Sequence, residues 1–326
     1  MCFSFLGKEG HHMDKSMLKY IAKRIMIAIV TLFVILVVLF VLTKLLPGSP
    51  INNDKLTPAQ RAVIMAKYGL DKSIPEQFVN YIVNMAHGDF GISYTLYKEY
   101  PVANLVFEAS KISFMLGIGA CIIGTIVGMA LGVFAALHRN TIWDTIATII
   151  SVIGVSIPSF VFALLLLMLL GVNLHILPTT YNSRNAFMSS ILPMLALSVS
   201  VIANVARFTR TEMISVLNSE YITLAKAKGL DKRTLIWRHT LRNALIPVIT
   251  ILGPILVNLM TGTMVVEQIC GVPGLGKLLI NSIHTNDVNI IMACSFLYAA
   301  MYIVMMLIID VAYGIIDPRI RLGKDE

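Results

Sequence analysis

The stretch GVPGLGKL, from Gly271 to Leu278, comes nearest in this sequence to a known chemical motif. A phosphate-binding loop has a glycine, four further residues, then Gly-Lys and a Ser or Thr whose hydroxyl holds Mg²⁺. The last position here is Leu278, which carries no hydroxyl. Such a loop also joins a β-strand to a helix. The surrounding elements therefore decide whether this stretch could bind a nucleotide.

Other residues that could perform chemistry lack the necessary spacing. The sequence contains neither HExxH nor GxSxG, so the usual motifs of an intramembrane hydrolase are missing. His175 and His284 have no paired ligands nearby and read as ordinary polar loop residues. No CxxC or CxxH pattern includes the cysteines, which are Cys2, Cys121, Cys270 and Cys294. We expect no metal site, no cofactor and no catalytic group.

The composition places most of the chain in lipid. Of its 326 residues, 57% are hydrophobic and 13% are charged, against about 25% charged in ordinary soluble domains. A net charge of +8 could indicate nucleic-acid binding, but no soluble domain remains to carry that function. In a membrane protein, such an excess is typical of basic loops on the cytoplasmic side.

Six apolar runs are long enough to cross a membrane: 25–46, 112–137, 145–172, 191–206, 244–266 and 290–309. The first is too long for a signal peptide and has no cleavage site, so it predicts a retained anchor. We divide the chain into an N-terminal segment 1–24, the first span 25–46, an outer segment 47–111, a five-helix core 112–316 containing a loop at 207–243, and a tail 317–326. Met1 and Met13 are alternative translation starts.

The loop charges predict the orientation. Residues 207–242 contain eight Lys or Arg and three Asp or Glu. With six spans, this loop, the N-terminus and the tail fall on one side, which the positive-inside rule makes cytoplasmic. The segment 47–111, where helical spacing predicts short helices, then lies outside the cell membrane together with the link after the fifth span. GVPGLGKL follows a membrane helix on that outer side, so we expect it to bind no nucleotide.

Small and polar residues within the spans leave two questions open. Ala120, Gly124, Gly128 and Gly132 recur every four residues, which suits either close helix packing or a substrate groove. Pro254, Asn258, Thr261 and Val265 share one face of the fifth span, with Gly262 beside it. That face could line a pathway or make interhelical hydrogen bonds. In the third span, Gly154, Ser156 and Pro158 predict a kink or break.

The loop between the fourth and fifth spans predicts two short helices. Asn218 or Ser219 can cap the first, Gly229 can end it in a left-handed conformation, and Asp231 can cap the second. Small residues such as Ala225 permit close approach of a partner, so the loop could fit a groove on another protein. Alternatively, its basic residues could rest on anionic lipid headgroups.

This loop resembles the cytoplasmic signature of permease subunits in bacterial ABC importers, in the peptide/nickel subfamily. The matching stretches are YI at Tyr221, AKAKGL from Ala225, RH at Arg238 and RNALIP from Arg242. Thr223 and Leu224 depart from the broader Glu-Ala-Ala form. Other stretches agree along nearly the whole chain, namely LPGSP, YGLDKSIPEQF, GDFGIS, VVEQICGVPGLGKLL and DPRIR.

The resemblance implies an all-α permease of the type I importer fold and an ATPase-coupling helix. The implied coupling residues are Glu220, Tyr221, Ala225, Ala227, Gly229 and Leu230, with the side near Ala225 packed against an ATPase groove. Asn258, Thr261 and Gly262 are the candidates for the pathway lining.

The implied partners are a second permease, two ATPase subunits and an external substrate-binding protein. The implied activity is peptide import by alternating access, with nickel or metal-chelate import as the alternative. A secondary transporter fits less well, because the charged candidates Lys44, Glu267 and Asp310 lie near span ends.

Overall fold

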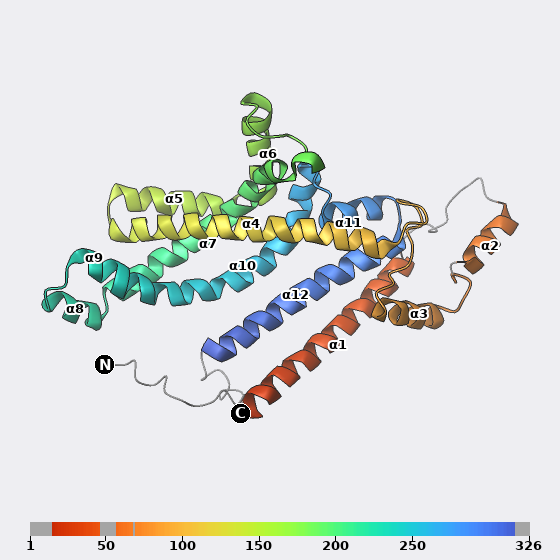
Figure 1. Ribbon diagram of the computed structural model, residues 1–326, viewed down its shortest axis with the longest axis horizontal. Helices are drawn as coiled ribbons and strands as arrows, with labels where there is room; N and C mark the ends of the chain where they lie inside the picture. The colour runs from red at the N-terminus through yellow and green to blue at the C-terminus, as the bar shows by residue number, and fades with distance from the viewer. Residues whose placement is uncertain (1–14, 46–56, 68, 317–326) are drawn as a thin grey trace.

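The computed structural model describes residues 15–45, 57–67 and 69–316. Within these ranges the regular elements are helices, and the β-structure is one isolated bridge between Ile92 and Pro101. The long helices run side by side, with α8 and α9 at one end of the bundle and α2, α3 and α11 towards the other (Figure 1). The α-helices are α1 Lys15–Leu45, α2 Pro58–Lys67, α3 Ile74–Ala86, α4 Val102–Leu137, α5 Ile142–Ser156, α6 Ser159–Leu166, α7 Ala186–Leu217, α8 Glu220–Ala227, α9 Lys232–Thr234, α10 Arg242–Ile269, α11 Leu275–His284 and α12 Val288–Ile316.

Five helical stretches are long and apolar enough to cross a membrane: 20–45, 102–137, 183–217, 232–259 and 288–311. The third span expected from the sequence is divided between α5 and α6, which meet at an angle of 103°. The count of six is reached when this bent pair forms one span. The predicted break is confirmed, since α5 ends at Ser156 and α6 begins after Pro158, whose ring cannot continue the preceding helix. A π-helix, η1 (Leu167–Asn173), follows α6.

Helix α4 begins ten residues before the expected start of the second span, at Val102 rather than at residue 112. Its first turns are amphipathic and bury Val102 and Val106 against Leu275 of α11 and Ile290 of α12. Charged residues on the opposite side of these turns lower the local hydropathy, so hydropathy alone did not indicate this part of the helix. The expected short helices of the segment 47–111 are confirmed as α2 and α3, while residues 46–56 lie outside the described residues.

The glycine ridge of α4 is a packing surface. A Cβ atom at Gly124 would lie 2.4 Å from the Val201 Cβ, and one at Gly132 would lie 2.5 Å from the carbonyl oxygen of Ala206. Real side chains do not approach so closely, so α4 and α7 touch through their backbones along this ridge. Of the two alternatives for the ridge, close packing is the one that the structure contains.

The segment between α3 and α4 is attached to the start of α12 by Asp287. Its buried carboxylate accepts hydrogen bonds from the Ser93 hydroxyl at 2.6 Å and from the backbone N–H groups of Thr95 at 2.9 Å and Leu96 at 3.0 Å. The α2–α3 region is thereby joined to the membrane helices through a short loop held by one acidic side chain.

Candidate functional site

The first candidate region is the knob, which we define as residues 218–241. Its first helix, α8, ends at Ala227, and Gly229, two residues later, has a φ of +79°. The Leu230 N–H donates back to the Ala225 carbonyl at 3.3 Å. The predicted terminator is therefore confirmed, because this positive φ favours glycine. Ser219 occupies the capping position, but its hydroxyl donates to the Val216 carbonyl at 2.6 Å and does not cap α8.

The second helix of the knob begins as the sequence predicts. Asp231 caps α9 by accepting a hydrogen bond from the Thr234 N–H at 3.0 Å. Hydrogen bonds from Thr234 hold the pKa of the Asp231 carboxyl below its usual value. A π-helix, η3 (Leu235–Leu241), then leads directly into α10. The two short helices therefore form a compact turn that is continuous with a membrane helix.

The underside of the knob is a small apolar cluster. Ile222, Ala225 and Leu235 are buried against one another and contact Val216 at the end of α7. Ala225 is only 8% exposed, so its side chain packs within the chain. The expectation that the side near Ala225 meets an ATPase groove stays a prediction, while Ala225 itself faces the interior of the knob. The reason is that Leu235, which follows the turn, folds back over this small side chain.

The outward side of the knob carries the other five coupling candidates. Glu220, Tyr221, Ala227, Gly229 and Leu230 are all exposed. Among the large apolar side chains of the knob, Leu224 is 57% exposed and Tyr221 is 44% exposed. The sequence reading treated Leu224 as a departure from the importer signature, yet it stands beside Tyr221 on the open face. The phenolic oxygen of Tyr221 accepts a hydrogen bond from the Asn243 amide at 3.1 Å.

The knob is braced against the bundle. Met213 of α7 and Ile236 of η3 pack with Ala136 of α4 in one buried cluster. Nearby, the guanidinium of Arg210 on α7 donates two hydrogen bonds to the carboxylate of Asp144 on α5. The distance from Nη2 to Oδ2 is 2.7 Å. Asp144 is buried, and a bidentate pair in such a place fixes orientation as well as charge. The α7 extension that carries the knob is thus attached to α4 and α5.

The second candidate region is the semi-polar stripe of α10. Pro254, Asn258 and Val265 are exposed on the surface of the chain, so this face does not pack inside the described bundle. Thr261 and Gly262 lie in the same helix, but their side chains are outside the described residues. The exposed stripe is available to a neighbouring subunit or to a pathway.

The third region is the turn from α10 to α11, where GVPGLGKL lies. The stretch joins two helices and no strand, as the sequence predicts. The carboxylate of Glu267 is buried and accepts hydrogen bonds from the Gly276 N–H at 2.8 Å and the Lys277 N–H at 3.2 Å. The N-terminus of α11, where a phosphate would bind, is therefore occupied by the chain's own negative charge.

Close packing completes this turn. The Ser113 hydroxyl of α4 donates to Glu267 at 2.6 Å and accepts from the Leu275 N–H at 2.8 Å. A Cβ atom at Gly274 would lie 2.4 Å from the Glu267 carboxyl carbon, so only glycine fits there. The Lys277 ammonium donates to the Gly271 carbonyl at 2.9 Å. We name this arrangement of Glu267, Ser113 and the α11 N-terminus the carboxylate cap.

Sequence reasoning identified the knob but missed the carboxylate cap. From the sequence alone, Glu267 is a charge near a span end, although the small residues Gly274 and Gly276 after it indicate that another group approaches closely. The described residues contain no group of three or more His, Cys, Asp or Glu placed to hold a metal ion. The cysteines among them, Cys121, Cys270 and Cys294, are buried and unbridged.

Comparisons with known families cover almost the whole chain. The family described as "Binding-protein-dependent transport system inner membrane component" matches residues 128–322. The family of the corresponding N-terminal region, "Binding-prot-dependent transport system membrane comp, N-term", matches residues 17–108.

Curated proteins are similar to this chain in sequence over nearly its full length. The chain is 43% identical to the oligopeptide transport system permease protein OppB of Escherichia coli K12 over 306 residues, covering 94% of this chain and 100% of the relative. It is 40% identical to the dipeptide transport system permease protein DppB of Lactococcus lactis, with the same coverage. It is also 40% identical to DppB of Bacillus subtilis over 309 residues, covering 94% of this chain and 99% of the relative.

A solved structure shares the fold of about two thirds of this chain. The crystal structure of an amino acid ABC transporter with histidines contains a chain that superposes with a TM-score of 0.51. The match covers 64% of this chain and 92% of that chain, at 15% sequence identity.

We predict that Glu267→Ala destabilises the protein strongly. The change leaves buried donors without an acceptor, each at a cost of about 1–3 kcal/mol, so we expect the thermal unfolding midpoint in detergent to fall by at least about 5 °C. Glu108→Ala is the matched control, because Glu108 makes only an exposed ion pair with Lys111 at 2.7 Å. Its midpoint should change by less than about 2 °C. Equal shifts in the two variants would contradict the carboxylate cap.

Proposed function

Because the chain belongs to the family of binding-protein-dependent transport system inner membrane components, we propose that it imports peptides as one of two permease subunits in an ATP-driven importer. It is a multi-pass protein of the inner membrane. As the permease component, it performs no catalysis itself, and ATP hydrolysis is the task of separate subunits.

One observation supports peptides as the substrate. Relatives named for oligopeptide or dipeptide transport in three bacteria are 40–43% identical to this chain across nearly its full length. The similarity to these relatives extends over both the core and the N-terminal region and is not confined to the signature of the knob. We therefore favour peptides over the alternative cargo, nickel or a metal chelate.

We assign ATPase coupling to the outward side of the knob. Tyr221 and Leu224 offer large apolar side chains on a short helix, next to small residues that permit close approach. Apolar anchors of this kind supply most of the binding energy in protein interfaces. The buried cluster beneath them, with Ala225 at its centre, keeps α8 in place while the open face meets the partner.

The proposed assembly contains this chain, a second related permease, two ATPase subunits and an external substrate-binding protein. Binding of ATP closes the ATPases, which move the knobs and open the permease pair outward, and hydrolysis restores the inward-facing state. Since the knob is braced to α4, α5 and α7, its movement is transmitted to these helices. The exposed stripe around Asn258 is suited to line the pathway between the two permeases.

The proposed orientation places the knob and both termini in the cytoplasm. The eight basic residues against three acidic ones in 207–242 support this side, and the α2–α3 region and α11 then lie outside. In that arrangement the external binding protein meets the end of the bundle that contains the carboxylate cap.

We predict that deletion of the gene abolishes growth of an amino-acid auxotroph on a short peptide that contains the required amino acid. The free amino acid should restore growth, which is the control for general damage, and a plasmid copy of the chain should restore use of the peptide. Uptake of radiolabelled peptide measures the same loss directly. If peptide uptake is unchanged while nickel accumulation falls, the metal alternative replaces this proposal.

A second prediction concerns the knob. Tyr221→Ala combined with Leu224→Ala should lower co-purification of the ATPase subunits and ATP-dependent uptake by about tenfold or more, because two interface anchors are truncated. The comparison variant replaces Lys226, Lys228, Lys232 and Arg233 with Gln. If the knob instead rests on anionic lipid, the variant without these four charges fails and the apolar double variant does not.

A third prediction concerns orientation. In a cysteine-free variant, a single cysteine at His284, which is exposed at the end of α11, should react with an impermeant maleimide added to intact cells. A cysteine at Lys226, which is exposed on the knob, should react only after lysis. The proposed orientation is wrong if the order of reactivity is reversed.

A further inference from the structure

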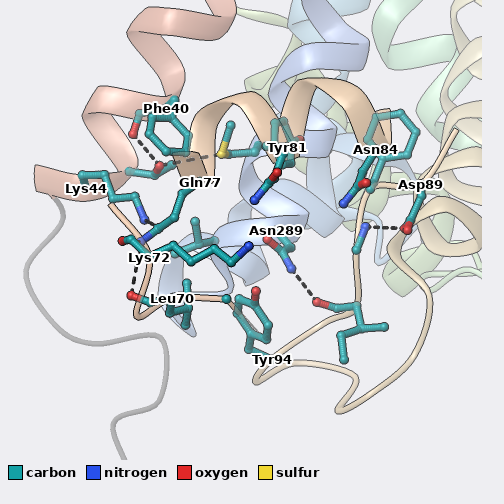
Figure 2. Close-up of a pocket in the computed structure, with 18 of the residues that line it drawn as sticks. Phe40, Lys44, Leu70, Lys72, Gln77, Tyr81, Asn84, Asp89, Tyr94 and Asn289 are labelled. Atoms are coloured by element: carbon teal, nitrogen blue, oxygen red, sulfur yellow. Dashed lines mark hydrogen bonds between the residues drawn. The ribbon is translucent and has the colours of Figure 1, made fainter. Parts of the chain in front are cut away.

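A cavity of about 790 Å³ lies where α1 ends, beneath the α2–α3 region (Figure 2). Phe40 and Lys44 of α1 form one wall, Gln77 and Asn84 of α3 another, and Asn289 at the start of α12 contributes to the floor. Its volume is within the range of small-molecule sites in proteins. Nothing in the proposed transport cycle uses this cavity.

The lining offers more cationic than anionic groups. Lys44, Lys67 and Lys72 contribute ammonium groups, whereas Asp89 is the one acidic side chain among the described lining residues. Lys67 is already paired with Glu99 at 2.7 Å, so Lys44 and Lys72 are the cations considered for a ligand. The Asp89 carboxylate is already bound to the Gly91 N–H at 2.8 Å. Lys72 pairs with Glu76 at 3.0 Å, but both side chains are about half exposed, so this pair is weak and can exchange for a stronger anion.

Lys44 is held at the cavity wall. Its ammonium donates to the Gln77 side-chain oxygen and lies 5.1 Å from the centre of the Phe40 ring. Both contacts leave further N–H groups of this ammonium for an anion. An ammonium group fixed beside an aromatic ring at the end of a membrane helix is well placed to bind a phosphate at the bilayer surface.

Carboxamide groups surround the same space. Asn80 and Asn84 line the cavity with exposed carboxamide groups. Asn289 donates to the Ile92 carbonyl at 2.8 Å. Carboxamides can both donate to and accept from hydroxyl groups, so the cavity suits a ligand that has hydroxyls as well as negative charge.

The position of the cavity indicates that the ligand comes from the membrane. Lys44 lies in the last turn of α1, where the apolar run ends at the level of the lipid headgroups. Only 11% of the apolar window of α1 is buried within the chain, so most of this helix is open to lipid or to a neighbouring subunit. Phe40 and Met292 give the cavity an apolar side.

From this combination, we propose that the cavity binds the headgroup of an anionic phospholipid that carries hydroxyl groups, of the phosphatidylglycerol class. Lys44 and Lys72 bind the phosphate, and Asn80 and Asn84 bind the glycerol hydroxyls. The bound lipid joins α1 to the α2–α3 region.

The test measures lipid binding to the importer complex purified in detergent. Dioleoyl phosphatidylglycerol is titrated, and native mass spectrometry counts the bound lipids. In the variant Lys44→Gln with Lys72→Gln, one lipid should bind about tenfold more weakly, because two charge-assisted hydrogen bonds are lost. The matched control, Lys98→Gln with Lys111→Gln, removes the same charge from exposed positions outside the cavity and should bind as the parent does.

A second variant keeps the charge and tests the amides. Asn80→Ala with Asn84→Ala should lose the preference for phosphatidylglycerol over phosphatidylmethanol, which has the phosphate but no hydroxyl groups. Equal binding of phosphatidylcholine by the parent complex overturns the proposal. Displacement of the lipid by inorganic phosphate makes the cavity a site for a free anion, and displacement by a tripeptide makes it a substrate site. Either result overturns the lipid assignment.

Discussion

Polar groups that fold away from water must find their partners within the chain, and this constraint shapes the protein at three places. Each place is served by a buried carboxylate. Glu267 binds the N-terminus of α11, Asp287 binds the loop before α4, and Asp144 binds Arg210. A buried carboxylate is stable only when several donors surround it. These acidic side chains therefore determine how the short helices and loops are oriented on the long apolar ones.

The close contact between α4 and α7 depends on small residues rather than on buried carboxylates, but it also fixes the orientation of the helices. Glycines remove side-chain volume at Gly124, Gly128 and Gly132, so the two helices approach through their backbones. Beyond this contact, α7 continues past the bundle into the knob. Because the knob is also attached to α4 through Met213, Ile236 and Ala136, a movement of the knob is transmitted to these helices, as the proposed coupling requires.

Much of this architecture could be predicted from the sequence, because hydropathy, glycine and proline act locally. Pro158 marked the break of the third span, Gly229 marked the end of α8, and GVPGLGKL follows a helix rather than a strand, as expected. The inward position of Ala225 could not be predicted in the same way. It depends on Leu235, which returns to the same place only after the turn has formed.

The partners of Glu267 and of the early part of α4 were hidden for a related reason. Helical periodicity identifies the face of a helix that is apolar, but it does not identify the residue that a polar side chain will meet across the fold. Ser113 and Glu267 are 154 residues apart in the chain. A pairing at this separation leaves no periodic signal in a single sequence, and only the glycines around it showed that the packing was tight.

These long separations also impose an order on synthesis. Ser113 enters the membrane before Glu267 and Leu275 have left the ribosome, and Ser93 precedes Asp287 by 194 residues. These contacts of Ser93 and Ser113 therefore stay unmade until α10, α11 and the start of α12 have been synthesised. Assembly of this protein finishes from its C-terminal third, so a ribosome that stops before α11 leaves behind helices that can be in the membrane but cannot yet be folded.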